Sequence, residues 1–290
     1  MLVLTKIQEI RDWVKEKRAK GEEIGFVPTM GYLHEGHLSL AAAARQENQG
    51  VVMSIFVNPT QFGPQEDYAS YPRDLARDCR LAEEAGVDVV FSPTVEEMYP
   101  QYPPLTVVEV REITSGLCGA SRPGHFTGVA TVVAKLFNIV QPDRAYFGQK
   151  DYQQVQVIKR MVRDLNIPVA IKTVPIKREE DGLAMSSRNT YLSPEERKEA
   201  LCLYQALKLC QELYAKGVTA ASDLIGAMCT RINQEPKAVI DYVAICDAES
   251  LAPVEEIKSR VVVALAVKIG KTRLIDNIVF GGDSFVQDNV

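Results

Sequence analysis

Apolar and polar positions follow two different periods along the first 176 residues. Short β-rich runs predict strands, and stretches with apolar residues at helical spacing predict helices between them. The predicted strands are EIGFV (23–27), VVMSIFV (51–57), VDVVF (87–91), TVVEV (106–110), RAYFG (144–148) and VAIKTVPI (169–176). Strands separated by helices imply right-handed crossovers, and therefore an α/β fold with a parallel sheet covered by helices on both faces.

Proline and glycine mark the predicted helix boundaries in this part of the chain. An Ala-rich helix ends near Gly50, and Pro72 opens a helix that stops at Gly86. A helix with valine, leucine and phenylalanine at helical spacing ends before Pro142, and another is predicted over 151–165.

The pattern changes near residue 177. Ser193, Pro194 and Glu196 form an N-terminal capping signature, from which a helix is predicted to run to Gly217, with a second helix beginning near Ser222. Three β-rich runs then follow with no helix between them, at 239–246, 260–269 and 272–280. This order predicts a small α+β domain with an antiparallel sheet. We therefore expect two domains, 1–176 and 177–290.

Charge and composition narrow the class of protein. Lys plus Arg is 33 and Asp plus Glu is 38, a net charge of −5, which argues against a broad nucleic-acid surface but allows a local basic pocket for a small anion. No apolar run approaches the ~18 residues that span a bilayer. The N-terminal stretch MLVLTKIQEIRDW alternates apolar and charged residues, unlike a signal peptide or anchor. We expect a cytoplasmic protein that binds neither nucleic acid nor membrane.

The six cysteines show no C-x-x-C pair and no zinc-site spacing, so we expect them to be reduced core or surface residues. They are Cys79, Cys118, Cys202, Cys210, Cys229 and Cys246, and Cys118 stands out because it lies in a Gly-rich loop.

The strongest candidate for chemistry lies between the first long predicted strand and the next helix. Two of only three histidines, His34 and His37, fall within four residues there. Gly31 permits a tight turn and Gly36 a close ligand approach. A helix N-terminus suits phosphate, and the imidazoles can donate hydrogen bonds to phosphate oxygens during phosphoryl or nucleotidyl transfer. The segment comprises Pro28, Thr29, Met30, Gly31, Tyr32, Leu33, His34, Glu35, Gly36 and His37.

Two alternative roles for this segment have less support. A capped turn with incidental histidines needs no ligand. A zinc site of the H-E-x-x-H type needs one more residue than HEGH provides. The chain has neither a P-loop lysine motif nor G-x-G-x-x-G, so neither of those phosphate cradles is present.

Two further segments also follow predicted strands or open predicted helices. Asp181 to Asn189 contains two hydroxyls beside a guanidinium, a mobile anion clamp when paired with the histidine turn, although Ser-Ser-Arg is common on surfaces. Phe147 to Gln154 offers Lys150 for a phosphate, Asp151 for Mg²⁺ and Gln154 for a polar substrate, or is a charged turn before a helix.

Smaller signals complete the candidate site. Gln61 follows a strand and can bind a hydroxyl or carboxylate. Arg122 lies beside His125 at a predicted helix start, a candidate carboxylate site, with a purely structural cap by His125 equally open. Because ligands collect at the carboxyl ends of parallel strands, all these segments predict a single cleft over one sheet edge.

Five blocks of the chain closely resemble the pantothenate synthetase (pantoate–β-alanine ligase) family. They are VPTMGYLHEGH, SIFVNPTQFGPQEDYASYPR, RPGHFTGVATVVAKLFNIVQPDRAYFGQKDYQQ, REEDGLAMSSRN and KIGKTRLIDN, in this order over nearly the whole chain. The resemblance implies a HIGH-type nucleotidyltransferase with a Rossmann-like, doubly wound N-terminal domain and a smaller C-terminal lid domain. It also implies a cytosolic homodimer that needs ATP and Mg²⁺.

The same resemblance implies a two-step ligation. The pantoate carboxylate attacks the ATP α-phosphate, giving pantoyl-adenylate and pyrophosphate, and the β-alanine amine then attacks the acyl carbon, giving pantothenate and AMP. His37 matches the residue assigned as proton donor, His34 supports the phosphates, and Gln61 and Gln154 hold pantoate, with Gln61 also facing β-alanine.

The matching ATP contacts are Met30 to His37, Gly148, Gln149, Lys150, Asp151, Lys177, Met185, Ser186, Ser187 and Arg188. Lys177 stands where the family is often apolar, and Gln149 where glutamate is frequent. Two rival functions remain open from the sequence: an HxGH nucleotidyltransferase that releases an adenylylated product, and a non-catalytic nucleotide sensor.

Overall fold

The computed structural model describes residues 1–64 and 66–281, which form two compact units. The N-terminal unit comprises Met1–Thr114, Arg122–Gln149 and Gln154–Val174. The C-terminal unit comprises Ser115–Ser121, Lys150–Gln153 and residues 175–281. Two short segments of the first half thus belong to the C-terminal unit, which no simple cut of the sequence predicts. The two-domain division at 176/177 stays a prediction.

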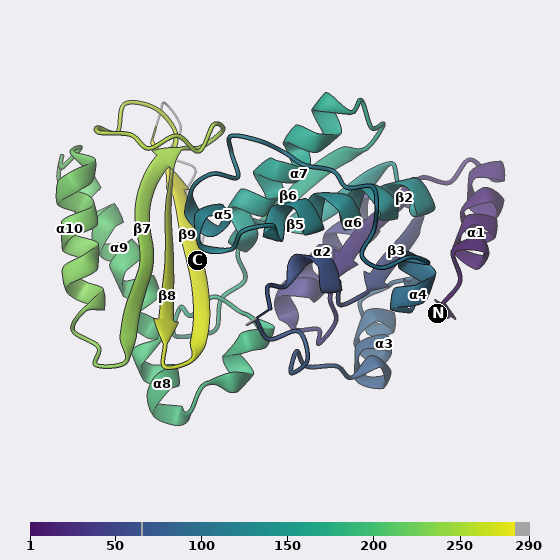
Figure 1. The fold of residues 1–290 in the computed structure, drawn as a ribbon, viewed down its shortest axis with the longest axis horizontal. Helices are drawn as coiled ribbons and strands as arrows, with labels where there is room; N and C mark the ends of the chain where they lie inside the picture. The colour runs from purple at the N-terminus through teal and green to yellow at the C-terminus, as the bar shows by residue number, and fades with distance from the viewer. Residues whose placement is uncertain (65, 282–290) are drawn as a thin grey trace. The chain divides into compact units, whose positions relative to one another are not determined.

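The N-terminal unit is built on a six-stranded parallel sheet with the order β1-β4-β3-β2-β5-β6. Figure 1 labels β2, β3, β5 and β6 of this sheet. Its strands are β1 (Leu2–Leu4), β2 (Ile24–Thr29), β3 (Gly50–Ile55), β4 (Val89–Phe91), β5 (Arg144–Gly148) and β6 (Ala170–Val174). The doubly wound parallel sheet expected from the alternating pattern is therefore confirmed. β1 was not predicted, since three half-exposed residues carry no periodic signal.

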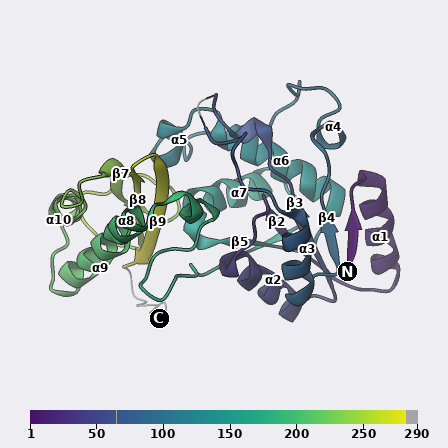
Figure 2. The same ribbon diagram turned by 90° about the horizontal axis from the view of Figure 1, so that it is seen from below.

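Helices cover both faces of this sheet, because its strands are apolar on both sides (Figure 2). Phe26 of β2 packs against Phe137 of α6, while the next residue, Val27, packs in the cluster with Leu40 of α2. The helices of this unit are α1 (Ile7–Ala19), α2 (Glu35–Glu47), α3 (Leu75–Glu84), α4 (Val95–Met98), α6 (His125–Val140) and α7 (Tyr152–Asp164), whose first two residues lie in the other unit, with the 3₁₀ turns η1 (Pro59–Gln61) and η2 (Gln149–Asp151).

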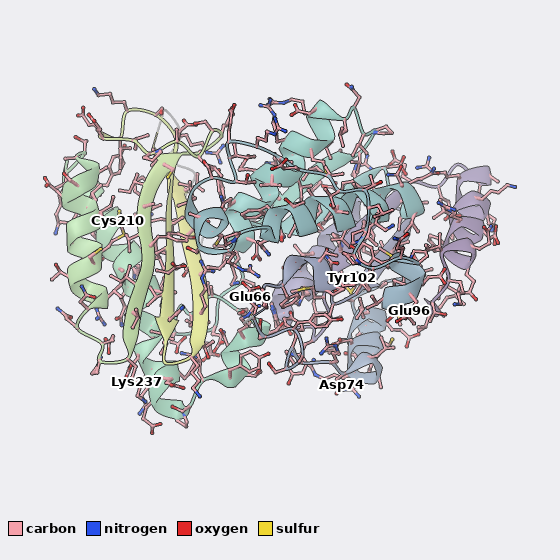
Figure 3. The ribbon with its side chains drawn as sticks, viewed as in Figure 1. Glu66, Asp74, Glu96, Tyr102, Cys210 and Lys237 are labelled. Atoms are coloured by element: carbon pink, nitrogen blue, oxygen red, sulfur yellow. The ribbon has the colours of Figure 1, made fainter. Side chains whose placement is uncertain are left out.

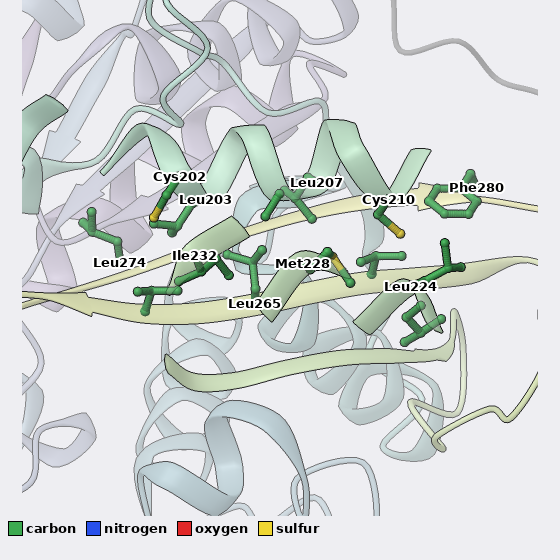
Figure 4. Packing of buried hydrophobic residues seen from close by; sticks show 14 of the residues in the cluster. Cys202, Leu203, Leu207, Cys210, Leu224, Met228, Ile232, Leu265, Leu274 and Phe280 are labelled. Carbon is green, nitrogen blue, oxygen red and sulfur yellow. The ribbon is translucent and has the colours of Figure 1, made fainter. Parts of the chain in front are cut away.

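The C-terminal unit pairs helices with a three-stranded antiparallel sheet in the order β7-β8-β9. The strands are β7 (Ala238–Asp247), β8 (Val261–Ile269) and β9 (Thr272–Phe280), and the helical elements are α5 (Leu117–Ser121), η3 (Ser187–Tyr191), α8 (Pro194–Glu199), α9 (Leu201–Ala215) and α10 (Ala221–Ile232). Leu203 and Leu207 of α9 and Met228 of α10 pack over Leu265 of β8 (Figure 4). The predicted small α+β domain is confirmed.

Two predictions in the N-terminal unit were wrong. Residues 106–110 form no strand in the part of the chain that the structure describes, because β-rich residues need a neighbouring strand to complete the hydrogen-bond ladder. α3 begins at Leu75 rather than Pro72, because the Asp74 carboxylate caps it by accepting the Arg77 N–H at 3.0 Å (Figure 3).

The predicted long helix from Ser193 to Gly217 was also wrong, because it is interrupted at Ala200. The capping box is present, with Ser193 and Glu196 bonding each other's backbone. Ala200 is fully buried, has ψ −20°, and its carbonyl accepts from the Leu203 N–H, an i to i+3 bond. The α-helical bonding pattern therefore breaks there into α8 and α9.

All six cysteines are free, and four of them are buried. Burial raises the pKa of the Cys210 thiol to about 12, which keeps it protonated and inert. In residues 1–64 and 66–281 no helix has the length and apolar character that crossing a membrane requires.

Candidate active site

The carboxyl ends of the parallel strands share one edge of the N-terminal sheet, and the candidate segments of this unit begin there. Met30 to His37 follow β2 directly, and η1 with Gln61 follows β3 after three residues. Gly148 ends β5, and Gln154 lies in the first turn of α7. A parallel sheet therefore gathers segments that are more than a hundred residues apart in the sequence.

The histidine turn is shaped by two left-handed residues and a capping box. Gly31 has φ 83° and Tyr32 has φ 50°. His34 is the N-cap of α2, and its Nδ1 accepts the Gly36 N–H at 3.1 Å. The Nδ1 of His37 accepts the His34 N–H at 3.3 Å, so each histidine satisfies a backbone donor at the helix start.

This arrangement decides which ring nitrogens carry hydrogen. Since both Nδ1 atoms accept hydrogen bonds, Nε2 is the protonated nitrogen of each neutral ring. The two ring centroids are 4.1 Å apart. An imidazolium would carry a second hydrogen on Nδ1 and lose its capping bond. The turn therefore places two neighbouring Nε2–H donors at the N-terminus of a helix.

A buried carboxylate holds the backbone of the turn. Asp78 of α3 is 1% exposed and accepts the N–H groups of Tyr32 and Leu33, both at 2.7 Å. Successive backbone N–H groups at left-handed residues form a concavity that binds anions. Here the protein supplies the anion itself, so these two amides are already used. Burial raises the pKa of Asp78, and the two amide hydrogen bonds offset only part of that rise.

Sequence reasoning missed Asp78, although a signal was present. The residue lies four positions before fully buried Ala82, on the inward stripe of an amphipathic helix. An acid on an apolar stripe must find partners, because an unpaired buried charge is costly. The sequence could flag the residue, but only the fold names the partners.

Gln61 is held by an amide network in which each orientation follows from its neighbours. Asn58 is 1% exposed, and its Oδ1 accepts from the Tyr99 hydroxyl at 2.9 Å and from the Thr60 hydroxyl at 2.9 Å. The Asn58 Nδ2 therefore donates, to the Gly128 carbonyl at 3.2 Å and to the Gln61 Oε1 at 3.1 Å. The orientation of the Gln61 amide is thereby fixed.

The same network leaves the Gln61 Nε2 facing the thioether of Met30, with Nε2 and Sδ 3.2 Å apart. Sulfur is a weak acceptor, so an incoming hydroxyl or carboxylate oxygen can replace it at little cost. Met30 and Gln61, which come from different candidate segments, are thus brought together.

Arg122 and His125 converge on the same residue from the start of α6. The Gln61 carbonyl accepts from Arg122 Nη2 at 3.3 Å and lies 2.9 Å from His125 Nδ1. Arg122 Nη1 lies 3.0 Å from His125 Nε2. Because a guanidinium only donates, Nε2 accepts and Nδ1 donates.

Glu66, a residue that sequence reasoning did not single out, neutralises this arginine (labelled in Figure 3). Its carboxylate accepts from Arg122 Nε at 2.6 Å and from Nη2 at 2.7 Å. Burial alone would raise the pKa of Glu66, but the hydrogen bonds and charge of Arg122 outweigh it and lower the pKa to about 2. The two partners are 56 residues apart, and no local pattern links them.

The C-terminal unit carries the remaining candidates. Ser186 caps η3 by accepting the Arg188 N–H at 3.3 Å, and Ser187 is buried. The Lys177 carbonyl accepts the Met185 N–H at 3.0 Å, so the backbone of Lys177 is used within the unit. A small pocket is lined by Lys150 and Ser186 together. Two of the predicted phosphate-binding segments therefore meet inside this unit.

The chain matches the model of the pantoate-beta-alanine ligase family over residues 2–279. It belongs to this family. The sequence-based predictions of the family and of a ligase are confirmed. Relatives at high identity agree: the pantothenate synthetase of Moorella thermoacetica is 62% identical over 280 residues, covering 96% of this chain and 98% of that protein. That of Acetivibrio thermocellus is 61% identical over 280 residues, covering 96% and 99%.

Solved structures of the family have the same fold. The pantothenate synthetase of Thermus thermophilus superposes with a TM-score of 0.91 at 50% identity, covering 96% of this chain and 99% of that chain. The pantoate-beta-alanine ligase of Francisella tularensis, in complex with beta-gamma ATP and beta-alanine, superposes with a TM-score of 0.80 at 37% identity, covering 96% and 97%.

Proposed function

We propose that this protein condenses pantoate with β-alanine to pantothenate, through a pantoyl-adenylate, with release of pyrophosphate and AMP. Family membership over residues 2–279 carries the reaction. The two Nε2–H donors of His34 and His37 at the start of α2 give it a physical basis, since they lie where a helix N-terminus attracts phosphate.

In the first step an oxygen of the pantoate carboxylate attacks the α-phosphorus of ATP. A new P–O bond forms, the bond to the bridging oxygen of pyrophosphate breaks, and pyrophosphate leaves with its charge. His37 donates a hydrogen bond to the phosphate oxygens as charge builds on them, and His34 supports the neighbouring phosphates. Such fixed donors contribute about 10²–10³ in rate each.

Pantoate binds through its polar groups to Gln61 and Gln154. The Gln61 Nε2 exchanges its contact with the Met30 sulfur for the ligand, while its Oε1 still accepts from Asn58, so the residue offers one aimed donor. Arg122 and His125 contribute by holding the Gln61 carbonyl. The charge of Arg122 is already matched by Glu66, so positioning is the role we assign to it.

ATP contacts Met30 to His37 in the N-terminal unit. The further contacts we assign to it are Gly148, Gln149, Lys150, Asp151, Lys177, Met185, Ser186, Ser187 and Arg188. The carbonyl of Lys177 is not among the groups we assign to ATP, because it already accepts the Met185 N–H. Domain 177–290 acts as a lid over domain 1–176, and the protein works as a cytoplasmic homodimer.

Mg²⁺ accompanies the nucleotide. Within residues 1–64 and 66–281 no three His, Cys, Asp or Glu side chains gather as a metal cluster. Mg²⁺ is commonly held by one or two carboxylates together with substrate phosphates, and the exposed carboxylate of Asp151 fits that mode. The ion neutralises phosphate charge when bound with ATP.

In the second step the β-alanine amine attacks the acyl carbon of the adenylate, beside Gln61. The C–N bond forms, the C–O bond breaks so that AMP leaves with the bonding electron pair, and the nitrogen releases its proton to water. AMP is a far better leaving group than hydroxide, which makes the amide accessible. Holding the two reactants together supplies most of the remaining rate.

A coupled assay for AMP tests this function. Pantoate, β-alanine and MgATP are supplied together and then omitted in turn. The ligase yields AMP only when all are present, whereas a nucleotidyltransferase that releases an adenylylated product consumes ATP with pantoate and yields no AMP on adding β-alanine. Intact ATP binding with no turnover would indicate a nucleotide sensor instead.

Two variants of His37 test the adenylation step. His37→Ala should abolish pantoate-dependent pyrophosphate release and leave the fold intact. His37→Gln is the matched control for structure, because glutamine at this helix position completes a capping box but has no imidazole. Near-normal pyrophosphate release by His37→Ala would contradict the role of His37 in adenylation.

A further inference from the structure

β9 carries two adjacent polar residues that are almost fully buried. Asp276 is 3% exposed and Asn277 is 2% exposed, in a strand whose ends pack in the apolar cluster through Leu274 and Phe280. They belong to the block TRLIDN, to which the reaction assigns no role. Buried polar groups cost free energy unless their partners offset it, so these partners are informative.

Asp276 holds the serine–arginine segment through an arginine. Its carboxylate accepts from Arg178 Nη1 at 2.7 Å and from Nη2 at 3.0 Å. Arg178 Nη1 also donates to the Gly182 carbonyl at 3.1 Å, and the Arg178 guanidinium lies over the Tyr204 ring, 4.8 Å from its centroid. The turn that leads into Met185 is therefore fixed to β9.

Asn277 holds the second segment directly. Its Nδ2 donates to the Lys150 carbonyl at 2.9 Å, so the backbone that carries the Lys150 side chain is bonded to the same strand. Asn277 is itself oriented by Asp276, whose Oδ1 accepts the Asn277 N–H at 2.8 Å. One pair of residues thus fixes two segments that are distant in the sequence, and Lys150 and Ser186 line one pocket beside Asp276.

We propose that Asp276 and Asn277 are positioning residues that set the distance between the Lys150 segment and the Met185–Arg188 segment for ATP. The inference rests on the proposed function, since it assigns no new substrate. Phosphate groups demand closely placed donors, and a displacement of about 1 Å can cost about 10² in rate. Neither residue touches the nucleotide.

The test uses Asn277→Asp, which keeps the size of the side chain but removes the donor to the Lys150 carbonyl. The KM for ATP should rise about tenfold, as loss of one aimed hydrogen bond implies, while the KM for β-alanine stays within about twofold. Asn48→Asp is the matched control. Asn48 is 4% exposed and its Nδ2 donates to the Ala44 carbonyl at 2.7 Å, so the same chemical change lowers the melting temperature without changing the KM for ATP.

A double-mutant cycle separates positioning from stability. If Asn277 acts through Lys150, then Asn277→Asp should add less than about twofold to the KM for ATP in a Lys150→Ala background. Additive effects would overturn the proposal, as would an unchanged KM for ATP in a folded Asn277→Asp. Should that variant fail to fold, Arg178→Lys disturbs the other segment, because lysine cannot make the two-pronged contact with Asp276. A KM for ATP within about twofold of wild type in Arg178→Lys overturns it too.

These outcomes are distinct from failure of the function itself. A wild-type protein that forms no AMP from pantoate, β-alanine and MgATP refutes the proposed reaction. If the wild type is active and these substitutions leave the KM for ATP unchanged, only the role of β9 is refuted.

Discussion

The turn at Gly31 and the turn at Gly182 both lead into segments assigned to ATP, yet they are held in different ways. In the first, the buried carboxylate of Asp78 accepts two backbone N–H groups directly. In the second, the carboxylate of Asp276 acts through Arg178, which donates to the Gly182 carbonyl. The Gly31 turn is therefore held through its backbone N–H donors, and the Gly182 turn through its backbone carbonyl acceptor.

The difference follows from what each turn must present to its ligand. At the histidine turn the amides before the helix are used internally, so the imidazole Nε2–H groups are the donors that we assign to phosphate. At the second turn an ion pair does the holding, with its charges matched, and the hydroxyls of Ser186 and Ser187 stand next to Arg188. At the Gly31 turn, the free energy of folding includes the cost of burying one carboxylate, that of Asp78. At the Gly182 turn, stability depends on Arg178 and Asp276 remaining paired.

The largest effect should come from breaking that pair. Arg178→Met leaves Asp276 buried without its cation and should cost about 3–5 kcal/mol in the free energy of unfolding of the C-terminal unit. Asp78→Asn should cost less, about 1–3 kcal/mol, because the amide oxygen can still accept one N–H. Denaturant unfolding of both variants measures the contrast.

The double variant Arg178→Met/Asp276→Leu serves as its control. Removing both charges should recover part of the stability lost in Arg178→Met. If Asp78→Asn proved as destabilising as Arg178→Met, the distinction between the two anchors would be wrong.

Alanine at the two glycines should give the next largest effects. Gly182 has φ 97°, and a methyl group there would overlap the Tyr204 ring, so Gly182→Ala should cost about 2–4 kcal/mol. Gly31→Ala places a methyl group 2.9 Å from Asp78 Oδ2 and should cost about 1–3 kcal/mol.

Gly21 is the control for conformation alone. It has φ 73° and nothing within 4 Å of an added Cβ, so Gly21→Ala should cost only about 1–2 kcal/mol. The melting temperature should decrease least in Gly21→Ala, more in Gly31→Ala and most in Gly182→Ala. The opposite order would contradict the steric argument.

The two regions should respond to acid with opposite signs. Burial raises the pKa of Asp78, so as pH falls through the raised value the folded state gains a proton and the wild type gains stability over Asp78→Asn. A hydrogen bond from Arg197 lowers the pKa of Asp181, so its contribution is present above about pH 4 and is lost as pH falls through the lowered value.

Melting curves from about pH 6 to about pH 3 measure the difference in stability between the wild type and each of the two variants. The difference between wild type and Asp78→Asn should widen on acidification, and that between wild type and Asp181→Asn should shrink. Parallel curves would show that the two carboxylates sit in similar surroundings.

The smallest effects should come from the capping side chains. Ser186→Ala removes the cap on the Arg188 N–H and should cost about 0.5–1 kcal/mol. His34→Asn should leave the melting temperature nearly unchanged, because asparagine is a good N-cap, while adenylation slows. Thermal unfolding and pyrophosphate release, measured side by side, separate the cap from the imidazole.

Much of the fold could be read from local pattern. β2, β3 and β5 are short apolar runs beside helices with clear boundaries, and the order of elements fixed the fold class. The strand predicted at 106–110 was wrong because β propensity reflects packing against a neighbouring strand rather than a property of the segment itself. The helix is interrupted at Ala200, although alanine is the strongest helix former, so the residue's identity gives no sign of the break.

The candidate site divides in the same way. His34, His37 and Gln61 could be selected by residue type and place, because they follow strands whose carboxyl ends meet. Asp78, Glu66 and Asn277 could not be given roles, since each acts on a backbone or side-chain group 45 or more positions away.

The family, most of the order of strands and helices, and the segments predicted to carry the chemistry follow from the amino-acid sequence, because they depend on periodicity and on residue type. Which carboxylate holds which turn is a property of the folded chain. Hydrogen bonds such as those from Leu33 to Asp78 and from Asn277 to Lys150 join distant parts of the chain, and their geometry exists only once the sheets have formed.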